Sequence, residues 1–114
     1  MAIIVIDIDD FTLVNDRHGH GAGDELLCEV TALWASAIRG TDAIARVGGD
    51  EFVVVMERAM GDQARAVLDR VRGLTAQSFS AGIAAWDGLT PFEAMVARAD
   101  EALYADKRLR RGAP

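Results

Sequence analysis

Runs of apolar residues along the chain predict four strands. Residues 2–8 are apolar apart from Asp7 and do not alternate with polar residues, which is typical of a short strand covered on both faces. Residues 42–46 and 52–56 predict two further strands, and the Gly48-Gly49-Asp50 turn between them indicates a hairpin. Residues 78–85 supply the fourth predicted strand.

Apolar residues that recur every three or four positions predict three helices. The first includes residues 26–38, with Asp24 as a candidate N-cap and Gly40 as a candidate stop. The second covers residues 62–71, and the third begins at Pro91. Residues 15–24 are rich in Gly, Asn and His, so we expect a loop there.

This order of elements, β-α-β-β-α-β-α, predicts an α+β fold. We expect a sheet of about four strands that contains antiparallel pairs, as in ferredoxin-like or polymerase-palm-like domains. The 114 residues suffice for one core, so residues 1–114 are expected to form a single domain. Because each helix carries one apolar stripe, the helices are expected to cover one face of the sheet better than the other.

Composition and charge exclude several classes of function. The formal net charge of −6 argues against nonspecific binding to nucleic acid or to anionic membranes. No apolar run is long enough to span a bilayer, and we expect no signal peptide before the run at residues 3–6. The single cysteine, Cys28, excludes an intrachain disulfide. The sequence therefore predicts a cytoplasmic location with no nucleic-acid partner and no membrane segment.

Two glycines followed by two carboxylates, Gly48-Gly49-Asp50-Glu51, form the clearest candidate for a chemical site. Glycines let a turn approach a ligand closely, and carboxylates bind hard cations. Asp7 lies near the end of the first strand, so a central strand beside the hairpin would bring Asp7 to Asp50. Such a pair suits Mg²⁺, and phosphoryl transfer is the natural chemistry. The alternative is that these residues only form turns.

An ordered set of motifs resembles the GGDEF-domain family of diguanylate cyclases, which condense two GTP molecules into cyclic di-GMP. In chain order the motifs are Asp7-Ile8-Asp9-Asp10-Phe11, Asn15-Asp16, Gly19-His20, Gly23-Asp24, Gly48-Gly49-Asp50-Glu51-Phe52, Ser80-Ala81-Gly82-Ile83-Ala84, and Ala99-Asp100-Glu101-Ala102-Leu103-Tyr104 followed by Lys107. The resemblance runs from end to end and implies a nucleotidyl-cyclase palm-like sheet packed with helices. The family's usual N-terminal helix and D-x-L-T-G-L-x-N-R segment have no match, so we expect an N-terminally shortened domain.

The resemblance implies the catalytic and metal-binding residues. Asp7, the carbonyl of Ile8 and Asp50 would bind Mg²⁺ or Mn²⁺. Glu51 would help to deprotonate or orient the attacking 3′-hydroxyl. Two protomers would each bind GTP and face one another, so the resemblance implies catalysis by a homodimer.

The resemblance also implies how GTP is bound. Asn15 and Asp24 would recognise guanine, because an amide and a carboxylate match its donors and acceptor. The remaining candidates for substrate contact are Phe11, Thr12, Gly48, Gly49, Lys107 and Arg111. Thr12 stands where the family usually has a lysine, so we expect weaker GTP binding or slower turnover. The alternatives are a helix N-cap for Asp24, a turn residue for Asn15, and stabilisation of a helix C-terminus by the basic residues.

Arg39 and Asp42 match the family's R-x-x-D inhibitory site, where the product cyclic di-GMP binds away from the active centre. Arginine pairs with phosphate or guanine, and Asp42 would accept from guanine donors. Arg70 would add a contact from a neighbouring subunit. The alternative is a plain salt bridge between Arg39 and Asp42.

Three hypotheses for function follow. The first is a diguanylate cyclase domain, alone or as the cytoplasmic part of a larger sensor protein. The second is an inactive or weakly active module that binds cyclic di-GMP or GTP as a sensor. The third is a structural oligomerisation domain.

Overall fold

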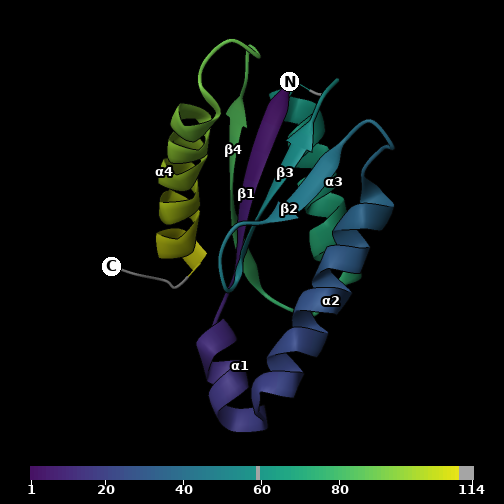
Figure 1. Ribbon diagram of the computed structural model, residues 1–114, viewed down its shortest axis with the longest axis vertical. Helices are drawn as coiled ribbons and strands as arrows, with labels where there is room; N and C mark the ends of the chain where they lie inside the picture. Colours follow the sequence, from purple (N-terminus) through teal and green to yellow (C-terminus); the bar gives the residue numbers. More distant parts are fainter. Residues whose placement is uncertain (59, 111–114) are drawn as a thin grey trace.

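The described part of the chain contains four strands and four helices (Figure 1). The computed structural model describes residues 1–58 and 60–110, apart from the side chains of Thr12 and His20. The elements are β1 (Ala2–Ile8), α1 (Phe11–His18), α2 (His20–Ala37), β2 (Ala43–Arg46), β3 (Glu51–Met56), α3 (Gly61–Leu74), β4 (Phe79–Ala85) and α4 (Phe92–Arg110). The predicted α+β class and four-stranded sheet are confirmed.

The sheet has the strand order β2-β3-β1-β4, and all neighbouring strands are antiparallel. All seven residues of β1 are buried, as the non-alternating apolar pattern predicts. In the register of β1 with β3, Ala2 is opposite Met56 and Asp7 is opposite Glu51. The end of β1 and the start of β3 therefore meet at one edge of the sheet.

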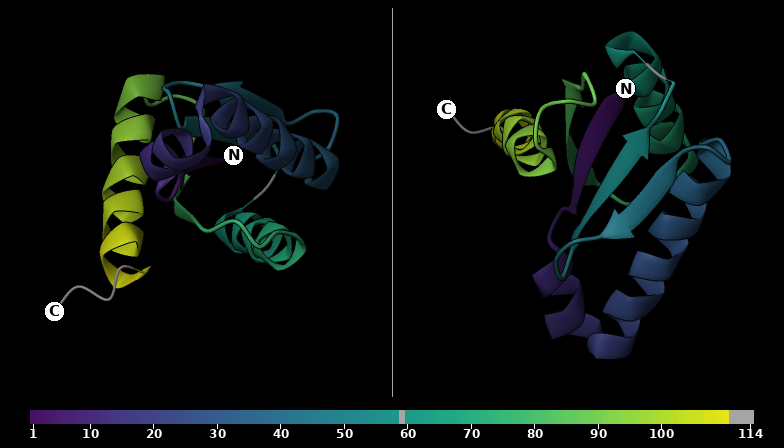
Figure 2. Two further views of the ribbon diagram at one scale, coloured as in Figure 1. Left: turned by 90° about the horizontal axis from the view of Figure 1, so that it is seen from below. Right: turned by 45° about the horizontal axis from the view of Figure 1, so that its top comes forward.

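Helices cover both faces of the sheet (Figure 2). Ile4 and Ile6 of β1 pack with Trp34 of α2 and Leu68 of α3 on one face. On the other face Ile3 and Val5 pack with residues of α4, namely Met95, Ala99 and Leu103. Cover is uneven, as expected, because α4 lies over β1 and β4 while most of β2 stays exposed.

The predicted loop over residues 15–24 is wrong, because α1 and α2 meet there with only Gly19 between them. Gly19 has φ of 87°, a conformation that glycine adopts without a steric penalty. Gly23 lies so close to Asn15 that a Cβ at this position would overlap the Asn15 amide. The glycines thus allow a tight turn and close helix packing. Asp24 lies inside α2 and is not its N-cap.

Gly82 lets α4 approach the sheet closely. A Cβ at this position would overlap the backbone of α4 at the Ala99 carbonyl and the Leu103 nitrogen. Gly82 lies opposite Val5 in the register of β1 with β4. The absence of a side chain here therefore fixes how α4 sits on the central strand.

Candidate active site

The end of β1 and the β2–β3 hairpin form one acidic site. The N–H of Ile8 donates to the carbonyl of Asp50 at 3.0 Å, and Asp7 lies opposite Glu51. The structure therefore brings together Asp7, Ile8, Asp50 and Glu51, the four residues expected at the metal and catalytic centre. An open hollow of about 460 Å³ lies beside them and is lined by Ile8, Asp10, Phe11, Leu13, Asp16, Asp50 and Lys107.

Asp7 is the buried carboxylate of this site, with 9% of its surface exposed. Its Oδ2 accepts a hydrogen bond from Nζ of Lys107 at 2.8 Å. Its Oδ1 is buried and has no hydrogen-bond partner among the described residues. Burial, reinforced by the proximity of Asp50, raises the pKa of Asp7, and Lys107 only partly opposes this.

Glu51 is in a similar environment. Burial raises its pKa, and repulsion from Asp100, Asp7 and Asp50 adds to the effect. Asp100 belongs to α4, so this helix contributes negative charge to the site. The sequence singled out Asp100 only as part of a helix motif.

The donor set fits a hard divalent cation. A cation would relieve the repulsion between Asp7 and Asp50 and would supply a partner for the buried Oδ1 of Asp7. No group of three or more His, Cys, Asp or Glu side chains in residues 1–58 and 60–110 is arranged to hold a metal ion. Two carboxylates and one backbone carbonyl suit Mg²⁺, which usually keeps water and substrate phosphates as its other ligands.

Asp9 shows the opposite behaviour. Burial disfavours its ionised form, but hydrogen bonds from Ser78 and Ser80 and the charge of Arg110 outweigh burial and lower its pKa. Oγ of Ser80 donates to Oδ1 of Asp9 at 2.7 Å, and Nε of Arg110 lies 3.5 Å from Oδ2. These contacts attach the turn after β1 to β4 and α4. The sequence did not predict this network.

Comparison with known proteins decides the family. The family model described as "Diguanylate cyclase, GGDEF domain" matches residues 1–113. The chain belongs to the GGDEF domain family. Diguanylate cyclase DosC of Escherichia coli is 33% identical over 121 residues, which cover 95% of this chain and 26% of that protein. The chain thus spans about a quarter of the length of this curated relative.

Solved GGDEF domains share the fold. The active GGEEF domain of a diguanylate cyclase from Vibrio cholerae superposes with a TM-score of 0.86 at 34% identity, covering 94% of this chain and 76% of that one. The GGDEF domain of DgcB from Caulobacter crescentus, solved in complex with cyclic di-GMP, gives a TM-score of 0.86 at 29% identity, covering 94% of this chain and 71% of that one. No helix in the described part of this chain has the length and apolar character needed to cross a membrane.

Of the other residues expected to contact substrate in this GGDEF domain, some lie at the hollow and others do not. Phe11 and Lys107 line the hollow, and Gly48 and Gly49 form the hairpin turn beside it. Asn15 lies on α1 and Asp24 on α2, and neither is among the described residues that line the hollow. The side chain of Thr12 and the whole of Arg111 lie outside the described part of the chain.

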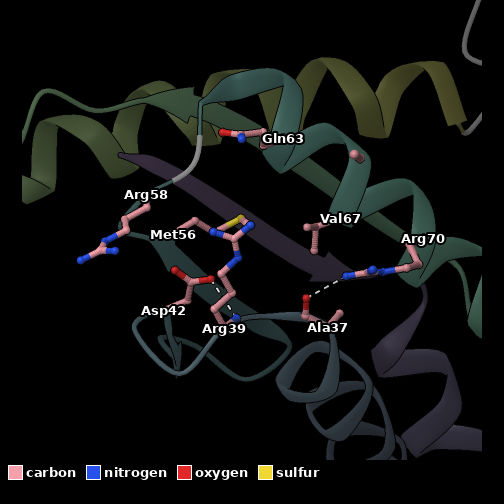
Figure 3. Close-up of a pocket in the computed structure, with 9 residues that line it drawn as sticks. Ala37, Arg39, Asp42, Met56, Arg58, Gln63, Val67 and Arg70 are labelled. Carbon is pink, nitrogen blue, oxygen red and sulfur yellow. Dashed lines mark hydrogen bonds between the residues drawn. The ribbon is translucent and has the colours of Figure 1, made fainter.

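A second pocket collects the expected inhibitory residues of the GGDEF domain (Figure 3). It has a volume of about 330 Å³ and is lined by Ala37, Arg39, Asp42, Met56, Arg58, Gln63, Ala66, Val67 and Arg70. Arg70 was expected to act from a neighbouring subunit. Here it lies in the same pocket of this chain, where its Nη2 donates to the Ala37 carbonyl at 2.9 Å. Arg58 is a further cation of the pocket that the sequence did not single out.

Asp42 holds the wall of this pocket in place. Its Oδ2 accepts from the backbone N–H of Arg39 at 3.0 Å, and its Oδ1 accepts from the N–H of Glu57 at 3.1 Å. These bonds join the turn after α2 to the end of β3. The alternative salt bridge to the Arg39 guanidinium is not among the described contacts of Asp42.

Proposed function

We propose that this chain is a diguanylate cyclase domain that condenses two GTP molecules into cyclic di-GMP. The observation that carries the proposal is the convergence of Asp7 and Asp50 at one sheet edge, with an oxygen of Asp7 buried and unpartnered among the described residues. Two carboxylates held close together with one oxygen left open are what a divalent cation requires. Membership of the GGDEF family supports the same chemistry.

Asp7, the carbonyl of Ile8 and Asp50 are the residues that would hold Mg²⁺ or Mn²⁺. When bound, the cation would neutralise the negative charge that develops on the transferred phosphoryl group. Lys107 pairs with Asp7 in the structure at 2.8 Å. Lys107 also lines the hollow beside the acidic pair, and its ammonium group is a proposed contact to a phosphate oxygen.

Glu51 is the proposed base for the 3′-hydroxyl. Burial and the neighbouring carboxylates raise its pKa, which makes its carboxylate a better proton acceptor. The 3′-oxygen attacks the α-phosphorus, the bond from this phosphorus to the bridging oxygen breaks, and pyrophosphate leaves with the bonding pair. Glu51 takes the hydroxyl proton. Each chain supplies one GTP, so the full reaction needs a homodimer.

Asn15 and Asp24 are the proposed contacts to the guanine base. The proposed contacts to the rest of the substrate are Phe11, Thr12, Gly48, Gly49, Lys107 and Arg111. A threonine at position 12 brings no charge to the phosphates, so we expect slower turnover than in relatives with a lysine.

Incubation of the purified chain with GTP and Mg²⁺ tests the proposal, with cyclic di-GMP as the measured product. We expect a rate that rises with the square of protein concentration while the dimer is scarce. Asp50→Asn should abolish product formation, whereas Asp69→Asn, on the exposed surface of α3, should not. Absence of product at high protein concentration, with the Asp50→Asn and unmodified chains alike, would reject the cyclase.

A second candidate function is binding of cyclic di-GMP as a sensor or inhibited enzyme. The pocket formed by Arg39, Asp42, Arg58 and Arg70 favours it, because guanidinium groups bind phosphate and guanine. Calorimetric titration with cyclic di-GMP should show binding that Arg39→Ala weakens and Arg65→Ala does not. We further propose that the chain works in the cytoplasm as part of a larger signalling protein.

A further inference from the structure

One arginine holds the turn that carries the acidic pair. Arg46, the last residue of β2, donates from Nε to the carbonyl of Gly48 at 3.0 Å and from Nη2 to the carbonyl of Gly49 at 2.7 Å. Both donors lie on one edge of the planar guanidinium group, so the two bonds form a fork. The fork fixes two successive peptide groups directly before Asp50.

The neighbouring carbonyls of the hairpin are held by other groups. The carbonyl of Asp50 accepts from Ile8 at 3.0 Å, and that of Glu51 accepts from Val47 at 2.9 Å and Gly48 at 3.2 Å. Four successive carbonyls, from residue 48 to residue 51, thus have defined donors. Only the first two depend on a side chain, and that side chain is Arg46.

The fork also sets the direction of two N–H groups. No described peptide bond is cis, so the C=O and N–H of each peptide point in opposite directions. When Arg46 holds the carbonyls of Gly48 and Gly49, the N–H groups of Gly49 and Asp50 point away from the guanidinium. Successive N–H groups of this kind form anion-binding sites. Gly49 has open space around its Cα, so a ligand meets no side chain there.

We propose that Arg46 is a positioning residue for the nucleotide and metal site. Its fork holds the Gly48–Asp50 backbone so that the carboxylate of Asp50 faces Asp7 and the N–H groups of Gly49 and Asp50 are available to a phosphate. The identity of the ligand as a nucleoside triphosphate with a divalent cation rests on the proposed function. The ordering of the turn by Arg46 does not.

The proposed role of Arg46 depends on the shape of its guanidinium group and not on its positive charge alone. Lysine carries the same charge but has one nitrogen, so it cannot hold both carbonyls in the arrangement that a planar guanidinium imposes. Arg46→Lys is therefore expected to resemble Arg46→Ala. Arg65 on α3 is exposed and lines neither pocket, so Arg65→Ala is the matched control.

Backbone ¹⁵N relaxation of the chain without ligand is the first test. We expect the heteronuclear NOE of residues 48–50 to fall in Arg46→Ala and Arg46→Lys and to stay unchanged in Arg65→Ala. Added methylguanidinium should restore part of the order in Arg46→Ala. Equal NOE values for residues 48–50 in Arg46→Ala and in the unmodified chain would overturn the proposal.

Ligand binding and turnover form the second test. Titration with Mn²⁺ in the presence of a non-hydrolysable GTP analogue, followed by electron paramagnetic resonance, should show weaker binding in Arg46→Ala. The kcat for cyclic di-GMP should fall about 10- to 100-fold, the range found when groups that orient metal ligands are removed. Full activity in Arg46→Lys would overturn the proposal, because charge alone would then suffice. If the unmodified chain makes no cyclic di-GMP, the proposed function fails while the NOE comparison still decides the role of Arg46.

Discussion

Two aspartates only two positions apart, Asp7 and Asp9, show how local donors decide the role of a residue. Burial disfavours the ionised form of both. Two serine hydroxyls and Arg110 satisfy Asp9, so its pKa is lowered and its oxygens are used within the fold. Among the described residues only Lys107 donates to Asp7, so burial and the neighbouring Asp50 raise its pKa and one oxygen remains for a ligand.

Asp87, in the loop before α4, should titrate at a lower pH than an ordinary aspartate. Backbone N–H groups of Thr90 and Leu89 and the Thr90 hydroxyl hydrogen-bond its carboxylate and lower its pKa below 3.8. The folded pKa is thus below the unfolded one, so its stabilisation is complete above the unfolded value and is lost as pH falls through the folded value. Carboxyl ¹³C shifts measured against pH give this pKa directly.

Thr90→Val is the matched variant for Asp87. It removes the hydroxyl donor and keeps both backbone donors, so the pKa of Asp87 should rise towards 3.8 without reaching it. An unchanged pKa in Thr90→Val would assign the whole shift to the backbone.

The elements that the sequence predicted correctly are those that local patterns determine without help from tertiary packing. The apolar run fixed β1, and the paired glycines located the hairpin correctly. The region around Gly19 and Gly23 was not predictable in this way, because glycine weakens a helix locally while packing of α1 on α2 requires it. Tertiary packing overrode local propensity there.

The candidate active site, like the fold, was predictable only in part. A central first strand beside the hairpin brought Asp7 and Asp50 together in the prediction, and the structure has them close together. The fork of Arg46 and the network of Asp9 depend on which way turn carbonyls and loop hydroxyls point. Sequence spacing carries no information on those directions.

Gly82→Ala should destabilise the packing of α4 on β4. The added Cβ meets backbone atoms of α4, which cannot rotate away as a side chain can. We expect a loss of about 3 kcal/mol in the free energy of unfolding, the upper end of the usual cost of overpacking. Urea denaturation measures this loss.

Gly73→Ala in α3 provides the control for Gly82→Ala. Nothing lies within 4 Å of a Cβ built there, so a helical alanine should stabilise the chain by about 0.5–1 kcal/mol. A similar loss in both variants would mean that the close approach of α4 is not the cause.

Gly23→Ala should disturb substrate binding more than stability. The nearest atoms to its Cβ are those of the Asn15 amide, so the added methyl group displaces this side chain rather than backbone. Since Asn15 is a proposed guanine contact, we expect the KM for GTP to rise about tenfold, consistent with the loss of one hydrogen bond to the base. Steady-state kinetics with Gly21→Ala, which has open space around it, provides the comparison.

For the whole molecule, one ion pair connects the helices on the two faces of the sheet. Arg72 of α3 bonds to Asp106 of α4 at 3.0 Å and to the carbonyl of Phe79 at 2.8 Å, and its guanidinium lies 4.8 Å from the centre of the Phe79 ring. Asp106 also accepts from the N–H of Ala81 at 2.9 Å. The pair thus joins α3, β4 and α4 at the end of the sheet near the proposed active site.

Asp106→Ala should weaken this connection by about 1–3 kcal/mol, because it leaves the N–H of Ala81 and Nη2 of Arg72 without their shared acceptor. Asp106→Asn keeps an acceptor oxygen and should lose less. Thermal unfolding of the two variants measures the difference. Equal losses would mean that the charge of Asp106 matters more than its hydrogen bonds.

The central position of β1 has a consequence for synthesis on the ribosome. β1 leaves the ribosome well before both of its partners, since Ala2 pairs with Met56 of β3 and Ala85 of β4. At about 5–20 residues per second, the nascent chain carries an unpaired apolar strand for several seconds. Crowded nascent copies can pair through such a strand, so a chaperone that covers β1 during synthesis should raise the yield of folded protein.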